Sequence, residues 1–183
     1  GVRNRDLIDR VRVSAPHGNA HVLTDHINDA VCKRWTEILR RVRGGKYNQE
    51  EVLDMIQHKA TKVLLFTAER ILLVSIKRRV VRWTARYGSI VSVETYGKTV
   101  LLNTKARYRR LRMTLPKKRV VLCESRDLQN SALTKLTRMR NAWLRTNRPL
   151  DGTGGLLTMG DLYDADSEDD LALIPEDVNL TIM

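Results

Sequence analysis

The chain has 183 residues, 42% of them hydrophobic, which is enough for one packed domain with appendages. No apolar run approaches the ~20 residues of a membrane-spanning helix, and the charged first residues predict no secretory signal peptide. The formal net charge is +12, yet residues 1–149 hold all 33 Lys and Arg with 12 of the 21 acids, and residues 150–183 hold nine acids and no base. This basic body with an acidic tail predicts a polyanion-binding surface.

The sequence offers no residues arranged for catalysis or metal binding. Cys32 and Cys123 are isolated and have no CxxC spacing, so they are expected to be two buried free thiols in a reducing compartment. The four histidines form no HExxH pair, and no nucleophile, base and orienting group share a recognisable spacing. We therefore expect no enzyme, no metal site and no cofactor. The chain begins with Gly1 rather than Met, which favours a piece of a longer polypeptide.

The first predicted element is a helix over residues 24–43. Thr24 is a suitable N-cap, and apolar side chains recur on one stripe that includes Ile27, Trp35 and Ile38. Gly44 and the glycine after it end the helix. Residues 50–58 fit neither a helix nor a strand clearly.

The stretch KVLLFTAERILLVSIKRR, residues 62–79, consists of two apolar runs around a polar interruption. A single helix through both runs would be apolar all round its axis and would bury Glu69 or Arg70. Two strands joined by a turn avoid this cost. The stretch therefore predicts a β-hairpin.

Further short strands follow, with turn signals about every 8–12 residues, as in an all-β meander, barrel or sandwich. We predict seven strands between Lys62 and Cys123, with turns at residues 87–89, 96–98 and 116–118. A helix comes next, in which Ser125 is the N-cap and Leu128, Ala132, Leu136, Met139 and Trp143 recur on one face. The predicted class is mainly β with flanking helices (α+β), a seven-stranded barrel or sandwich capped by a C-terminal amphipathic helix.

Three parts follow from this pattern. Residues 1–45 form an N-terminal linker and amphipathic helix, residues 46–148 form the β domain, and residues 149–183 form a disordered acidic tail. Ser167 precedes three acids, which suits an acidophilic kinase. The tail acids are expected either to fold back on the basic surface and compete for it, or to serve only as a solubilising terminus.

Seven short strands closed by one helix are the plan of a pleckstrin-homology-like domain. Within that class, a narrower resemblance rests on four features in chain order. They are Gly44-Gly45-Lys46-Tyr47, the acidic pair Glu50-Glu51, the hairpin LLFTAERI and then Trp83. Over roughly residues 18–145 the chain resembles the C-terminal end of the vacuolar protein sorting-associated protein 13 family, the bridge-like intermembrane lipid transfer proteins.

This resemblance implies a non-enzymatic module that targets a large lipid transfer protein to an acceptor membrane. The implied partners are anionic lipids such as phosphoinositides, an Arf-type small GTPase or a membrane-resident adaptor, and the rest of a larger polypeptide. The implied location is cytoplasmic, peripheral to membranes at organelle contact sites.

Binding a phosphoinositide needs convergent cations. If strands reverse at each turn, the loops at 77–79, 96–98 and 116–118 share one rim, and strand cations project outward beside it. The candidates are Lys77, Arg78, Arg79, Arg82, Lys98, Arg110, Arg112, Lys117, Lys118 and Arg119. The first hairpin offers only Arg70 beside Glu69, which favours diffuse attraction to an anionic leaflet over a stereospecific pocket. Taken singly, each of these cations is more often a solvated surface residue.

Two other functions stay open. The sequence pI of about 10.2 also fits a basic nucleic-acid-binding β-barrel, although one Phe, five Tyr and three Trp provide few stacking platforms. A sheet edge, or the groove between the sheet and the last helix, could also accept an extended segment of a partner protein.

Overall fold

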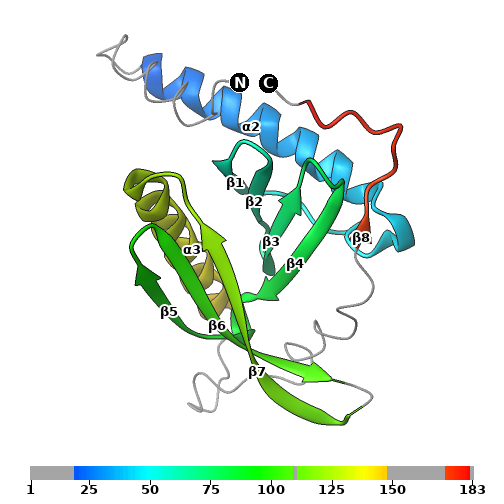
Figure 1. Cartoon of the computed structure of the whole chain (residues 1–183). Helices are drawn as coiled ribbons and strands as arrows, with labels where there is room; N and C mark the ends of the chain where they lie inside the picture. The colour runs from blue at the N-terminus through cyan, green and yellow to red at the C-terminus, as the bar shows by residue number, and fades with distance from the viewer. Residues whose placement is uncertain (1–18, 109–110, 148–171, 182–183) are drawn as a thin grey trace.

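The structure, a computed structural model, describes residues 19–108, 111–147 and 172–181. Two helices and two short 3-10 turns accompany eight strands within these ranges (Figure 1). In chain order they are α2 (Asn19–Arg40), η1 (Arg43–Gly45), β1 (Asp54–Lys59), β2 (Lys62–Phe66), β3 (Arg70–Ser75), β4 (Val80–Arg86), η2 (Tyr87–Ser89), β5 (Ile90–Tyr96), β6 (Thr99–Tyr108), β7 (Met113–Leu122), α3 (Arg126–Asn147) and β8 (Ala172–Leu173).

The strands form two antiparallel sheets. Sheet A has the order β1-β2-β3-β4-β8, and sheet B has the order β5-β6-β7. Helix α2 lies across one face of sheet A, and sheet B with α3 covers the other face (Figure 1). This arrangement confirms the predicted mainly-β class with a C-terminal helix. It is a sandwich rather than a barrel, because the described strands of the two sheets are not paired into one closed sheet.

The hairpin predicted from KVLLFTAERILLVSIKRR is confirmed as β2 and β3, paired from Lys62 opposite Ser75 to Phe66 opposite Ile71. Side chains alternate between the two faces of a strand. Val63 and Leu65 accordingly pack in the core beneath α2, while Leu64 and Phe66 pack in the core shared with sheet B and α3. Both faces of sheet A are covered, which explains why these strands are apolar at nearly every position.

The polar interruption in this hairpin is held by Glu50. One carboxylate oxygen, Oε1, accepts hydrogen bonds from Thr67 Oγ1 and from Arg70 Nε, both at 2.9 Å. The Arg70 guanidinium also lies 5.6 Å from the centroid of the Tyr47 ring. The side chains of Arg70 and Glu50 are only 13% and 12% exposed. Residues that carry the family resemblance therefore meet around one buried ion pair.

Helix α2 is longer at its start than predicted. It includes Asn19 and ends at Arg40, so Thr24 is an interior residue and its assignment as the N-cap is wrong. The sequence between Gly18 and Thr24 contains no glycine or proline that would stop a helix earlier. The predicted end of the helix before Gly44 is confirmed to within a few residues. Gly44 has a φ of +84°, a conformation that favours glycine.

Strands β6 and β7 correct the predicted turn at 116–118. Both strands run for ten residues, and Pro116 is paired with Lys105 in the middle of the ladder. Proline is tolerated there because β7 is an edge of sheet B, where no further strand needs its missing N–H group. The described chain therefore has six strands between Lys62 and Cys123 rather than seven, while β1 arises from the ambiguous residues 50–58.

Helix α3 follows its prediction closely. The Leu128 N–H donates to Ser125 Oγ at 3.2 Å, which confirms the N-cap. Four of the five predicted stripe residues are buried. Buried Asp54 on β1 fixes the helix to sheet A by accepting hydrogen bonds from Lys135 Nζ, at 2.6 Å, and from Arg138 Nη2.

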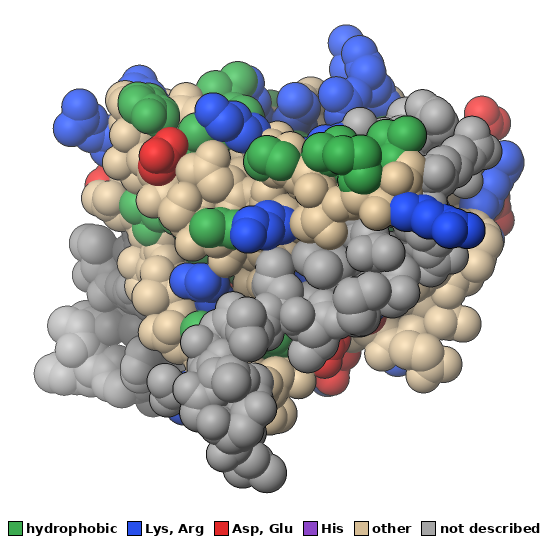
Figure 2. All heavy atoms as spheres, turned by 90° about the horizontal axis from the view of Figure 1, so that it is seen from below, with side chains coloured by type: hydrophobic (Ala, Val, Ile, Leu, Met, Phe, Trp, Pro, Cys, Tyr) green, Lys and Arg blue, Asp and Glu red, His purple; other side chains and the backbone are tan. Residues whose placement is uncertain are grey.

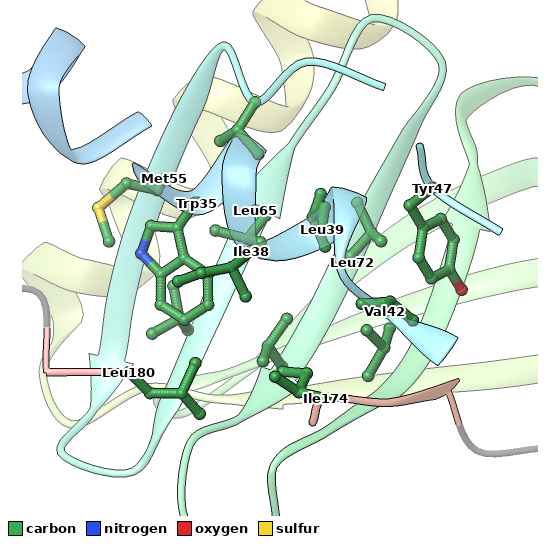
Figure 3. Packing of buried hydrophobic residues seen from close by; sticks show 14 of the residues in the cluster. Trp35, Ile38, Leu39, Val42, Tyr47, Met55, Leu65, Leu72, Ile174 and Leu180 are labelled. Carbon is green, nitrogen blue, oxygen red and sulfur yellow. The ribbon is translucent and has the colours of Figure 1, made fainter. Parts of the chain in front are cut away.

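The predicted disorder of residues 149–183 is wrong for residues 172–181. Strand β8 pairs antiparallel with β4, Ala172 lying opposite Val81 and Leu173 opposite Val80. The side chains of Ala172, Ile174, Val178 and Leu180 are buried in the core beneath α2. Figure 3 shows Ile174 and Leu180 in this core with residues of α2. Four apolar residues within an acidic composition were sufficient to anchor the segment.

Both cysteines are buried free thiols, as predicted. Burial raises the pKa of the Cys32 thiol to about 12 and also raises the pKa of Cys123. We expect the native chain at pH 8 to react with a disulfide reagent more than about a thousandfold more slowly than a free thiol. The reaction, followed by absorbance with and without urea, should become fast only on unfolding. Rapid labelling of the folded chain would contradict the burial of these thiols.

Candidate anion-binding surface

The turn between β3 and β4 holds three of the predicted cations, but they do not act alike. Arg79 has a φ of +54°, and its Nη2 donates to the carbonyl oxygens of Pro175, at 2.6 Å, and of Val178. Lys77 and Arg78 are exposed. The predicted rim therefore loses Arg79, which holds the C-terminal segment.

Four cations from different elements of sheet A come together beside this turn. Lys59 and Lys62 lie opposite each other at the end of the β1–β2 hairpin. Burial lowers the pKa of Lys62, and repulsion from Lys59, Arg82 and Arg78 lowers it further. None of these four residues has an ion-pair partner in the described part of the chain. A bound anion would relieve this repulsion.

Strand β7 contributes cations from both of its faces. Lys117 and Arg119 point to the inner face of sheet B, where each is partly buried over an aromatic ring. Lys117 Nζ lies 5.8 Å from the centroid of the Tyr108 ring, and the Arg119 guanidinium lies 5.8 Å from that of Trp83. Burial lowers the pKa of both side chains, and Arg119 lowers that of Lys117 further. Each cation therefore makes a cation–π contact near the outer limit of about 6 Å for that interaction.

Two contacts connect β7 with sheet A. Arg119 reaches Trp83, which follows Arg82 on β4. On β1, the Nδ1 atom of His58 lies 2.8 Å from the Leu122 carbonyl oxygen. His58 is the residue before Lys59. Strand β7 therefore runs past β1 and β4. We use the term basic surface for two groups of cations together, which are Lys59, Lys62, Arg78 and Arg82 on sheet A and Lys117 and Arg119 on β7.

The remaining predicted residues lie in other turns or strands or outside the described ranges. Lys98 is exposed in the β5–β6 turn, and its carbonyl oxygen accepts from the Cys123 N–H at 3.1 Å. Lys118 is exposed on the outer face of sheet B, opposite Asn103. Arg112 is exposed in the β6–β7 turn with a φ of +50°. Arg110, Ser167 and the tail acids Asp161, Asp164, Asp166, Glu168, Asp169 and Asp170 lie outside the described residues.

Sequence reasoning missed Lys59 and Lys62, because β1 was not recognised as a strand. The sequence Lys59-Ala60-Thr61-Lys62 could have indicated this pairing. It forms the turn of the first hairpin and places one cation on each side of the turn.

Exposed apolar side chains accompany the cations at the end of the β6–β7 hairpin. Leu111 is 60% exposed and Met113 is 52% exposed, and Arg112 lies between them. Figure 1 shows this hairpin extending away from the body of the domain. Seen from below in Figure 2, Lys and Arg side chains are interspersed with hydrophobic ones. Interleaved cations and apolar groups are typical of surfaces that meet a lipid interface.

Neither described helix is apolar enough along its length to pass through a bilayer. Among the residues that the structure describes, no group of His, Cys, Asp and Glu side chains could hold a metal ion.

Comparison with known proteins gives one finding. The family model described as "Intermembrane lipid transfer protein VPS13, C-terminal" matches residues 34–126, from α2 to the start of α3. No curated protein and no solved structure gives a significant match. The matched region contains every residue of the basic surface and the buried Glu50–Arg70 pair. Because the match spans just over half of the chain and confirms the resemblance predicted from sequence, the chain belongs to the family of C-terminal regions of the intermembrane lipid transfer protein VPS13.

Proposed function

We propose that the chain is a non-enzymatic, pleckstrin-homology-like module that anchors an intermembrane lipid transfer protein to the anionic surface of an acceptor membrane. The observation that carries this proposal is the cluster around Lys62, in which Lys59 lies opposite it across the β1–β2 hairpin and Arg78 and Arg82 are close enough to lower its pKa. Phosphates of lipid headgroups are anions of the required kind, and phosphoinositides concentrate several phosphates on one ring.

The magnitude of the attraction indicates a peripheral contact. Each cation near an anionic leaflet contributes about 1 kcal/mol, so the six residues of the basic surface give roughly 6 kcal/mol. This corresponds to a dissociation constant of tens of micromolar. Such a contact needs a second tether, which the rest of a larger polypeptide, an Arf-type GTPase or a membrane-resident adaptor would supply at a contact site.

Vesicle co-sedimentation at about 150 mM salt tests the proposal. The vesicles would contain phosphatidylcholine alone, phosphatidylserine, or a phosphoinositide, the last two matched in total charge. We expect binding to both anionic vesicles and none to neutral ones, and tighter binding to the phosphoinositide would identify the headgroup. Binding that is equal on all three vesicles would overturn the proposal. So would complete displacement by RNA or DNA with no measurable lipid affinity, an outcome that favours the nucleic-acid function.

The apolar end of the β6–β7 hairpin gives a separate prediction. Leu111→Asp removes a side chain that can insert among headgroups, at a cost of about 1.5 kcal/mol, so affinity for anionic vesicles should fall about tenfold. Leu53→Asp is a matched control, because Leu53 is 45% exposed and precedes β1 rather than lying in the hairpin. The same loss in both variants would mean that the hairpin does not enter the lipid interface.

A further inference from the structure

Residues 172–181 bind the domain in the manner of an added peptide. Their contact begins with two residues of β8 along the edge strand β4 and continues where the Ile174 N–H donates to the Arg79 carbonyl oxygen at 2.8 Å. Addition of an extended segment to a sheet edge is a recurring mode of peptide recognition. Here the extended residues are followed by a turn, in which the Val178 N–H donates to the Pro175 carbonyl oxygen at 3.1 Å.

Apolar anchors on one side of the segment fit a receptive surface of the domain. Ile174, Val178 and Leu180 are at most 6% exposed, and they pack in one cluster with Trp35 and Ile38 of α2. Figure 3 shows Ile174 and Leu180 among these side chains. The segment thus supplies side chains that complete the core, although its sequence is far from α2.

Three arginines hold the backbone and the acid of the segment from outside. Arg79 Nη2 donates to the carbonyl oxygens of Pro175 and Val178, and Arg34 Nη2 donates to that of Asn179 at 3.2 Å. Arg41 pairs with Asp177 at 2.6 Å, and this hydrogen bond lowers the pKa of the Asp177 carboxyl. The surface is therefore complementary to a segment that begins as a strand, then turns, and carries apolar anchors and at least one acid.

The segment is a separate piece of sequence from the rest of the sandwich. Residues 148–171 connect it to the end of α3, and it lies beyond residues 34–126, which match the family model. A segment that belongs to the same chain is present at a high local concentration, so it can occupy a site of only modest affinity.

We propose that the edge of β4 and the adjoining half of α2 form a peptide-binding groove for an acidic-apolar segment of a partner protein that adds a short strand to β4 and then turns over α2. Residues 172–181 are the resident ligand of this groove and compete with the partner. This site lies on the α2 side of sheet A, and its contacts at Arg79, Val80 and Val81 adjoin Arg78 and Arg82 of the basic surface. The proposal rests on the contacts of residues 172–181 and not on lipid binding.

A labelled peptide spanning residues 171–183, added to the full chain, tests this proposal by fluorescence anisotropy. The wild-type chain should bind it weakly, because its own segment occupies the groove. The Ile174→Asp chain should bind it at least tenfold more tightly, and a peptide with Ile174→Asp and Val178→Asp should not bind. Because Asp177 faces Arg41, the Arg41→Asp chain should prefer a peptide with Asp177→Arg. No binding by a folded Ile174→Asp chain would overturn the proposal.

Hydrogen exchange of the wild-type chain provides a second test, which does not require the Ile174→Asp chain to fold. An exchangeable ligand opens locally, so the Ile174 amide should exchange at least a hundredfold faster than the amides of β2 and β3. Equal exchange rates in β8 and the central strands would mean that the segment is a permanent part of the core, and would contradict the proposal.

Discussion

Replacing Glu50 by alanine is expected to lower the free energy of unfolding by about 3–5 kcal/mol, as is usual when one partner of a buried ion pair is removed. Glu50 and Arg70 are each nearly nine-tenths buried, and the Glu50 Oε1 oxygen serves both Arg70 and Thr67. The variant would keep the Arg70 guanidinium inside the protein without its carboxylate. Urea denaturation followed by circular dichroism measures the loss.

Two control variants distinguish the loss of the Glu50–Arg70 ion pair from a general effect of mutation. Glu51→Ala removes a neighbouring acid that is exposed, and its effect should stay within about 0.5 kcal/mol. The double variant Glu50→Leu/Arg70→Met replaces both charges by apolar groups, and it should recover much of the stability lost in Glu50→Ala. A Glu50→Ala chain as stable as Glu51→Ala would show that the pair does not hold the hairpin.

Neutralising the four sheet A cations is expected to weaken binding to anionic vesicles by roughly a thousandfold, at about 1 kcal/mol per cation. The variant is Lys59→Gln/Lys62→Gln/Arg78→Gln/Arg82→Gln. It should fold normally, because the substitutions relieve the repulsion on Lys62 and break no ion pair in the described chain. The melting temperature and a vesicle titration measure both properties.

The matched control removes the same charge from another side of the domain. Lys33→Gln/Arg40→Gln/Arg43→Gln/Lys46→Gln changes four exposed cations in and just after α2. If affinity depends on the basic surface, this variant should lose less than tenfold. Equal losses in both variants would indicate that only the net charge of the chain matters.

The β2–β3 hairpin and helix α3 could be predicted because their sequence patterns match the surroundings in which they pack. The β2–β3 hairpin is apolar on both faces since α2 and sheet B cover both faces of sheet A. Helix α3 has its N-cap at Ser125 and a regular buried stripe. In both cases the residues that define the element also pack it against its neighbours.

Other features depend on partners far away in the sequence. Pro116 is a strong turn signal, but pairing with β6 along a sheet edge keeps it in a strand. Residues 172–181 have no pattern of their own and become ordered only against β4 and α2. The sequence does not distinguish Arg79 from the other cations of its turn, because its role depends on contact with this segment. Arg78, Arg82, Lys117 and Arg119 could therefore be predicted as candidate cations, whereas Lys59 and Lys62 required knowledge of the β1–β2 pairing.

Paramagnetic relaxation on lipid nanodiscs tests the location of the membrane contact most directly. The nanodiscs would contain a phosphoinositide and a spin-labelled lipid, and amide signals of the full chain would be compared with and without the label. We predict that broadening concentrates at the β1–β2 turn, at Arg82 on β4 and along β7 to Leu111. Broadening concentrated on α2, with these residues unaffected, would contradict a membrane-facing basic surface.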